Sequence, residues 1–327
     1  MKYAREPGSS ASVVRSIGLG VHLVAALVLL ARAALAEPAT PSPRGEPHFS
    51  FVVTADPRAD HDSWMNALCE MRDSKGDEAP RFEPPSWIVV AGDFDPARQR
   101  MEDVQDVFAG QSAGPRLLPV IGNHDLKPDN MAFIRGEMLS RLPDVVRRQP
   151  DACDYYYDFR NVRLIALDLY GACGQNGTIN KEGRHWVETV LDSTPPTIDH
   201  IFLSFHDPAF PRGKHLKDSM NRDLRQRDAF WQLLVAHNDR VRAVFVGHTH
   251  CYSRMRVRGP EDALVKDVSA FPDELGGIYQ IDAGATGHAA SNTFVRVQID
   301  GKLATARAYA APNGSNQAFA VIDRWQF

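Results

Sequence analysis

The segment AVFVGHTH, residues 243–250, joins a strand-like run to a pair of candidate metal ligands. Its first half is apolar and β-branched, which is typical of a strand buried on both faces. A glycine and two histidines on alternate residues, His248 and His250, follow directly. Two imidazoles at this spacing can face one site or bind two adjacent metals. An unconstrained surface rarely needs this arrangement, so the segment predicts a buried strand that ends at a metal site.

The same pattern of an apolar run ending in polar residues occurs four times earlier in the chain. The four junctions are Phe49–Thr54 with Asp56, Trp87–Ala91 with Gly92-Asp93, Leu117–Ile121 with Gly122-Asn123-His124-Asp125, and Ile201–Phe205 with His206. Segments with apolar residues at helical spacing lie between them, at Asp60–Arg72, Asp129–Leu142, Lys181–Leu191 and Arg222–His237. Alternating strands and helices predict an α/β fold, in which ligands gather beyond the carboxyl ends of the strands. We therefore expect the five polar clusters to converge on one site.

Downstream of His250 the chain becomes rich in strand-like segments joined by Gly-rich or Asp-Gly turns. These segments are Ile278–Asp282, Thr293–Ile299 and Ala304–Ala310. They can complete a second sheet of the same domain.

Taken in order, the five clusters resemble the motifs of the calcineurin-like metallophosphoesterase family. The resemblance covers roughly residues 48–312, and the motifs are specific as a set although each alone is weak. The segment from Gly276-Gly277-Ile278 to Gly287-His288 is similar to the Gly-rich strand that commonly follows the last histidine pair in this family. The resemblance implies an α/β fold of two mixed β-sheets packed face to face, with flanking helices.

The resemblance also implies two divalent metal ions held by protein side chains. Mixed nitrogen and oxygen ligands suit manganese, zinc or iron better than calcium. Two such ions ~3.5–4 Å apart can clamp the attacking and leaving oxygens of a phosphoryl displacement. The implied ligands are Asp93 bridging both metals, Asp56 and His250 on the first metal, and Asn123, His206 and His248 on the second.

The same resemblance implies catalytic roles for His124 and Asp125, the two residues that follow Asn123. His124 would donate a proton to the leaving oxygen, a contribution of roughly 10²–10⁴ in rate. Asp125 would orient His124 through the other ring nitrogen. Asn123 would also contact the substrate.

The first motif departs from the family pattern, which is usually Asp-x-His with that histidine on the first metal. Here Arg58 stands two residues after Asp56, and arginine cannot ligate a metal because it stays protonated. Three ligands would remain, the usual number for a catalytic zinc. Arg58 could bind a substrate phosphate bidentately or form a salt bridge to Asp60 or Asp95. His61 could instead replace the missing ligand.

Other residues near the motifs leave alternatives open. Lys214, His215 and Lys217 follow the His206 cluster and could meet an anionic substrate or form a solvated basic loop. His288 could support the site or lie at the surface.

Residues 1–36 have the layout of a secretory signal peptide, with basic residues, an apolar stretch and a small-residue cleavage site. These parts are Lys2, Arg5 and Arg15, then Ile17–Ala31, then Ala34-Leu35-Ala36. An uncleaved anchor is the alternative, but the stretch contains His22 and is shorter than the ~20 residues needed to span a bilayer. We therefore expect an exported protein, periplasmic or secreted, without stable membrane anchoring. The expected order is a signal peptide over 1–36, a Pro-rich linker over 37–47, a metallophosphoesterase domain over 48–312 and a tail over 313–327.

Charge and cysteine content narrow the possible partners and the redox state. Removal of residues 1–36 leaves 33 basic and 40 acidic residues, a net charge of −7 with histidine neutral. Such a chain has no general attraction to nucleic acid or anionic membranes. The four cysteines allow two disulfides, and Cys153 with Cys173 is the favoured pair because they bracket a strand-like segment. Four buried thiols are the alternative.

These observations predict an exported metal-dependent hydrolase of phosphomonoesters or phosphodiesters. Its substrate would be a small-molecule or phosphoprotein phosphate ester. The alternative is a catalytically inactive binding module in which Arg58 replaces one metal.

Overall fold

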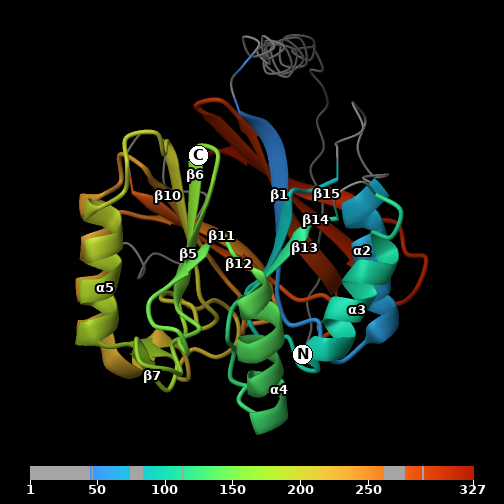
Figure 1. The fold of residues 1–327 in the computed structure, drawn as a ribbon, viewed down its shortest axis with the longest axis horizontal. Coiled ribbons are helices and arrows are strands. Elements are labelled where there is room, and N and C mark those ends of the chain that lie inside the picture. Colours follow the sequence, from blue (N-terminus) through green and yellow to red (C-terminus); the bar gives the residue numbers. More distant parts are fainter. Residues whose placement is uncertain (1–44, 46, 74–83, 112–113, 261–276, 289–290) are drawn as a thin grey trace, which may run out of the picture. The chain divides into compact units, whose positions relative to one another are not determined.

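Two β-sheets face each other at the centre of the fold, and helices cover their outer faces (Figure 1). In spatial order, the six-stranded sheet consists of β15 (Ala320–Gln326), β14 (Leu303–Pro312), β13 (Ser291–Asp300), β1 (His48–Thr54), β2 (Trp87–Val90) and β3 (Arg116–Pro119). The seven-stranded sheet consists of β11 (Tyr252–Val257), β12 (Ile278–Ala283), β10 (Val241–Val246), β9 (His200–Ser204), β6 (Val162–Ala166), β5 (Tyr155–Phe159) and β4 (Val145–Arg147). Each sheet combines parallel and antiparallel pairs. This confirms the predicted α/β fold with two mixed sheets.

The computed structural model describes residues 45, 47–73, 84–111, 114–260, 277–288 and 291–327. The predicted signal peptide and most of the predicted linker lie outside these residues, as does Gly276. Among the residues described, no helix is both long and apolar enough to cross a membrane.

The helices largely follow the predicted segments, with one addition. They are α2 (His61–Asp73), α3 (Ala97–Val107), α4 (Pro128–Phe133), α5 (Lys181–Asp192) and α6 (Leu224–Ala236). α4 continues into a π-helical turn (Ile134–Met138) and a 3₁₀ turn (Leu139–Arg141), and a second 3₁₀ turn (Met220–Asp223) precedes α6. A small ribbon of β7 (Gly174–Gln175) and β8 (Thr178–Ile179) completes the described elements. α2 and α3 lie beside the six-stranded sheet, and α5 lies beyond the seven-stranded sheet (Figure 1).

Strand β9 shows why the central strands are apolar throughout. Phe202 belongs to the core between the two sheets, where its ring centroid lies 5.3 Å from that of Phe51 in β1. Its neighbours Ile201 and Leu203 belong to a second core, formed with α5 and α6. Successive strand residues point to opposite faces, so a strand covered on both sides carries apolar residues on both faces, as Ile201, Phe202 and Leu203 do.

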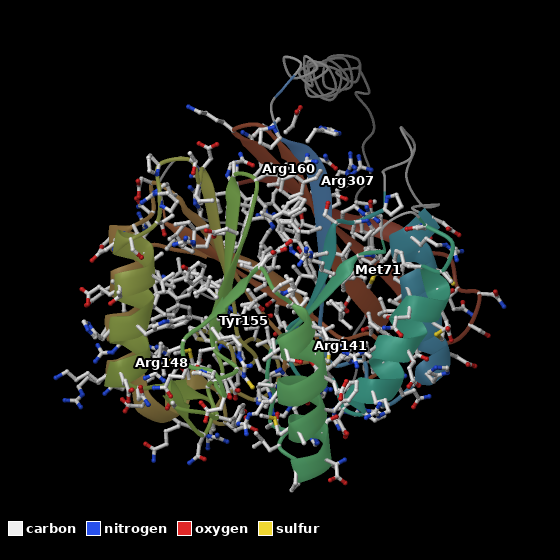
Figure 2. All side chains as sticks on the ribbon, viewed as in Figure 1. Met71, Arg141, Arg148, Tyr155, Arg160 and Arg307 are labelled. Atoms are coloured by element: carbon white, nitrogen blue, oxygen red, sulfur yellow. The ribbon has the colours of Figure 1, made fainter. Side chains whose placement is uncertain are left out.

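A buried tyrosine links the two sheets. Tyr155 of β5 lies in the inter-sheet core (Figure 2), and its hydroxyl donates a hydrogen bond of 3.0 Å to the carbonyl oxygen of Pro119 in β3. Burial of a tyrosine normally requires such a partner for the hydroxyl. The bond therefore joins β5 of the seven-stranded sheet to the end of β3 in the six-stranded sheet.

Two expectations are corrected by the fold. Residues 313–327 are more than a tail, because β15 lies in this segment and pairs with β14 in an antiparallel register. The four cysteines are free thiols, so the favoured pair Cys153 and Cys173 is not joined. Both of these thiols are buried, whereas Cys251 is exposed, and the alternative of four buried thiols is therefore also wrong.

Candidate metal centre

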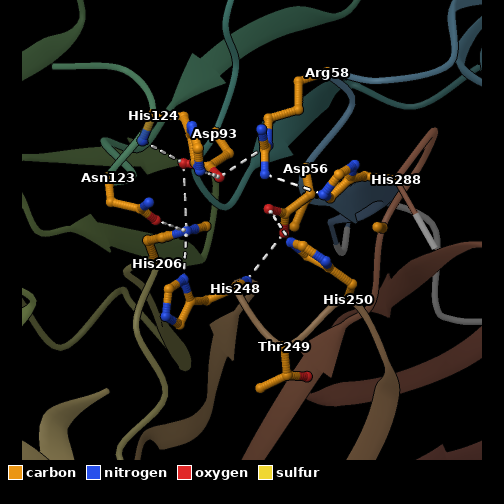
Figure 3. A network of polar contacts seen from close by, with 12 residues as sticks. Asp56, Arg58, Asp93, Asn123, His124, His206, His248, Thr249, His250 and His288 are labelled. Carbon is orange, nitrogen blue, oxygen red and sulfur yellow. Dashed lines mark hydrogen bonds and ion pairs between the residues drawn. The ribbon is translucent and has the colours of Figure 1, made fainter. Parts of the chain in front are cut away.

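The predicted polar clusters meet at the carboxyl ends of strands from both sheets (Figure 3). β1, β2 and β3 lead into three of the clusters, and β9 and β10 lead into the other two. The side chains brought together are Asp56, Asp93, Asn123, His206, His248 and His250. Separate strands thus deliver each member of the set to one place.

Four of these six residues have a positive φ angle, a backbone conformation that residues other than glycine rarely adopt. The φ angle is 51° at Asp56, 56° at Asp93, 71° at His248 and 56° at His250. Such conformations cost about 1–3 kcal/mol each and persist where the surrounding structure enforces them. Asp56 is enforced from both sides, because its N–H donates to the Gly92 carbonyl (3.1 Å) and its Oδ2 accepts from the His248 N–H (3.0 Å). Strain concentrated in this way is typical of a functional site.

The glycines of the second and third motifs allow the side chains to approach one another. A Cβ on Gly92, where φ is +94°, would lie 2.1 Å from Nδ1 of His206. A Cβ on Gly122 would lie 2.4 Å from Oδ1 of Asp93. Any larger residue at either position would therefore displace a candidate ligand.

One part of the site brings four electron-pair donors together around His206. Its Nδ1 lies 2.9 Å from the carbonyl oxygen of Ala91 and must carry a proton there, so Nε2 is the ring nitrogen that a metal could bind in place of a proton. This Nε2 lies 3.2 Å from Oδ1 of Asn123, 3.4 Å from Oδ1 of Asp93 and 3.2 Å from Nδ1 of His248. Ligands of a tetrahedral zinc are roughly 3.3–3.6 Å apart, given zinc–ligand distances of about 2.0–2.2 Å. The spacing therefore fits a metal ion.

The neighbouring ring has the matching tautomer. Nε2 of His248 lies 3.1 Å from the carbonyl oxygen of Asp218, to which it donates. The lone pair of Nδ1 then faces Nε2 of His206, beside the carboxylate of Asp93 and the amide oxygen of Asn123. Donation of the second ring N–H to a backbone carbonyl is the usual way in which proteins orient a metal-binding histidine.

The electrostatics of this position favour a cation. Burial lowers the pKa of His206, but the carboxylates of Asp93, Asp56 and Asp207 outweigh burial and raise it to about 9. Burial, followed by the neighbouring His206, lowers the pKa of His248 to about 3. The pair of histidines therefore carries one positive charge, on His206, while His248 stays neutral. This is expected where a metal ion takes the place of a proton.

The other part of the site has fewer free donors. Oδ1 of Asp56 lies 3.2 Å from Nε2 of His250, and both side chains are buried or nearly so. This Oδ1 has no hydrogen-bond partner among the described residues. The second oxygen of Asp93, Oδ2, lies 3.2 Å from Nε of Arg58.

The family model of the calcineurin-like phosphoesterases matches residues 49–252. The chain belongs to this family. Membership implies phosphoester hydrolysis with a divalent metal cofactor. Asp56, Asp93 and His206 have ligand atoms within 4.8 Å of one another and could hold such an ion.

Solved structures share the fold of this phosphoesterase at low sequence identity. A dimetal phosphatase from Danio rerio is 15% identical, with coverage of 85% of this chain and 100% of that chain and a TM-score of 0.54. PhoD is 11% identical, with coverage of 88% and 71% and a TM-score of 0.59. Purple acid phosphatase PPD1 from yellow lupin (Lupinus luteus) seeds is 13% identical, with coverage of 88% and 55% and a TM-score of 0.53. No curated protein matches the sequence.

Arg58 lies inside the site of the phosphoesterase, and it forms neither of the alternative salt bridges, to Asp60 or to Asp95. Nη2 of Arg58 lies 3.1 Å from Nε2 of His288, which places His288 in the site as well. Asp95 instead pairs with Lys127 at 2.7 Å, and Asp60 accepts hydrogen bonds from Ser63.

The substitute ligand considered for the first metal is not available. Nε2 of His61 lies 3.0 Å from Oδ1 of Asp103, outside the site. His61 therefore does not replace the missing histidine of the first motif.

His124 reaches the site, but Asp125 does not orient it. The His124 N–H donates to Oδ1 of Asp93 (2.9 Å), while its side chain is 42% exposed and Nε2 lies 4.0 Å from Oδ2 of Asp93. The buried carboxylate of Asp125 accepts from the N–H of Gly122 (2.8 Å) and from Nδ2 of Asn130 (3.2 Å). Asp125 thus braces the loop that carries Asn123 and His124, which corrects the expected role.

The basic loop after His206 supplies two residues to the site. Nδ1 of His215 lies 2.8 Å from Oδ2 of Asp218, and the His215 ring lies 4.2 Å from the ring of His248. The sequence singled out His215 but not Asp218. Asp218 accepts from His248 through its backbone carbonyl, a contact that any residue type could make and that the sequence therefore does not reveal. The lysines on either side of His215 are exposed.

Proposed function

We propose that this protein hydrolyses phosphate monoesters or diesters by means of a divalent metal held at Asp93, Asn123, His206 and His248. One observation carries the proposal: the amide oxygen of Asn123, a carboxylate oxygen of Asp93 and Nδ1 of His248 each lie 3.2–3.4 Å from Nε2 of His206. Manganese, zinc or iron suits this mixture of nitrogen and oxygen donors. When bound, such an ion supplies Lewis-acid chemistry that activates water and polarises a phosphoryl group.

The residues around the metal position provide the remaining functions. Asp93 stays ionised, because the attraction of His206, His124 and Arg58 lowers its pKa despite burial. Arg58 keeps 20% of its side chain exposed, so its guanidinium can donate to phosphoryl oxygens. The amide of Asn123 lies beside the same position and can help to orient the ester.

We assign proton donation to the leaving oxygen to His124. Its backbone is fixed by Asp93, and its exposed ring can meet a bound ester. His215 is the competing donor, because Asp218 holds its Nδ1 and leaves Nε2 for the substrate. The two histidines lie on different loops, so substitution of each can separate them.

The proposal includes export to the periplasm or the outside of the cell, where the substrate would be a small-molecule or phosphoprotein ester. The acidic mature chain gives no general attraction to polyanions, so recognition of phosphate must come from Arg58 and the metal.

Metal removal tests the proposed function. Protein treated with a chelator is expected to lose hydrolysis of an aryl phosphate or bis-aryl phosphodiester, and to regain it with manganese, zinc, iron or cobalt. His206→Ala should not regain it, whereas His185→Ala, which changes an exposed histidine of α5, should behave as wild type. No hydrolysis of either ester with any of these metals would reject the enzyme in favour of a binding module.

A further inference from the structure

We infer that the guanidinium of Arg58 replaces one metal ion of the centre, so that each chain holds a single metal, at His206. This inference rests on the proposed function and specifies its metal requirement. It differs from the two-metal centre that the sequence resemblance implies.

The two oxygens of Asp93 serve two different cations. Oδ1 lies 3.4 Å from Nε2 of His206 and faces the metal position. Oδ2 lies 3.2 Å from Nε of Arg58. In a two-metal centre this carboxylate would bridge two ions, whereas here it bridges the metal position and a fixed guanidinium.

A second contact anchors the guanidinium. Nη2 of Arg58 lies 3.1 Å from Nε2 of His288, whose ring centroid lies 4.3 Å from that of His250. Because a guanidinium can only donate, Nε2 of His288 must be the acceptor in this bond. Arg58 is therefore held on both sides, by Asp93 and by His288, and has a defined place in the site.

The donors left for a first metal are too few. Oδ2 of Asp56 already accepts from the His248 N–H, which leaves Oδ1 of Asp56 and Nε2 of His250. A catalytic zinc normally has three protein ligands. The third, Oδ2 of Asp93, is paired with Arg58, and a metal ion beside this guanidinium would be repelled by its charge. The residues around Asp56 and His250 therefore do not fit a second ion.

The replacement has a chemical consequence. A guanidinium carries a fixed positive charge, and its N–H groups match phosphoryl oxygens. Arg58 would thus contribute positive charge and hydrogen bonds to the ester where related centres would use an ion. The protein would then depend on the supply of one metal ion only.

Metal stoichiometry tests the inference independently of activity. Protein saturated with manganese and freed of excess ions is expected to contain about one equivalent, with the electron paramagnetic resonance spectrum of an isolated ion. Arg58→His restores a ligand at this place and should raise the content to two equivalents with a spin-coupled spectrum. Arg58→Lys keeps the charge without adding a strong ligand, and should remain at one.

A second variant keeps the test decisive if Arg58→His folds poorly. His250→Ala removes a donor that the single-metal centre does not use, so it should retain one equivalent. Two equivalents or a spin-coupled spectrum in the wild type would overturn the inference, and so would one equivalent in folded Arg58→His. Absence of metal from the wild type at saturation would instead reject the proposed function.

Discussion

Asp93→Ala is expected to lose the metal and to reduce kcat/KM for an aryl phosphate by at least about 10³. Oδ1 of the carboxylate would bind the metal ion, and Oδ2 pairs with Arg58. Removal of the carboxylate therefore leaves the metal ion and the guanidinium without their shared partner. Loss of metal assistance removes several kcal/mol of transition-state stabilisation, and each ~1.4 kcal/mol is a factor of ten in rate. Elemental analysis and steady-state kinetics on the same sample measure both effects.

A matched control separates this effect from the loss of any buried carboxylate. Asp154 is as deeply buried as Asp93, and burial raises its pKa to about 6. It lies outside the donor set and accepts from the Asp168 N–H at 2.8 Å. Asp154→Ala should therefore keep its metal and most of its activity. Retention of metal by Asp93→Ala would show that the ligand set is wrong.

His124→Ala should keep its metal and lose turnover in a way that depends on the leaving group. With a poorly activated alkyl phosphate, loss of the general acid is expected to lower kcat by roughly 10²–10⁴. With an activated aryl phosphate the loss should be much smaller, because that leaving group needs little protonation. The comparison of kcat for both esters, with metal content measured in parallel, tests the assignment.

His215→Ala is the comparison variant for this experiment. If it shows the strong leaving-group dependence and His124→Ala does not, the proton donor is His215 and the Asp218 carboxylate has the orienting role expected of Asp125. Equal kcat of wild type and His124→Ala on the alkyl ester would also disprove the assigned donor.

Much of the fold could be predicted because its central strands obey a local rule. Apolar runs such as Ile201–Phe205 end where the polar cluster begins, and each such run is a strand in the structure. The convergence of the ligands follows from parallel strands ending at the same edge. These features depend on residue type and order along the chain, which the sequence records directly.

Helix α3 was not predicted from the sequence because its buried face is partly charged. Arg100 and Asp103 are buried beside Val104 and Val107, and Nη1 of Arg100 donates to Oδ2 of Asp103 at 3.1 Å. Charged residues buried as a pair are invisible to a search for apolar periodicity. The helix was therefore indistinguishable from a loop in the sequence.

The finer contacts of the site depend on competition between partners that are distant along the chain. Asp125 could bond to His124 beside it, but Gly122 and Asn130 offer better-placed donors in the folded loop. Asp60 and Asp95 were possible salt-bridge partners of Arg58, yet Asp93 and His288 contact it in the structure. Such choices are settled by tertiary geometry, which residue types alone do not specify.

X-ray absorption spectroscopy of the zinc-loaded protein tests the central claim most directly, because it counts the imidazoles bound to the metal. Coordination by Nε2 of His206 and Nδ1 of His248 predicts two imidazoles per zinc, with the remaining ligands oxygen atoms. His250→Ala should leave this spectrum unchanged. A spectrum without imidazole scattering from the zinc would contradict the metal centre proposed for this phosphoesterase.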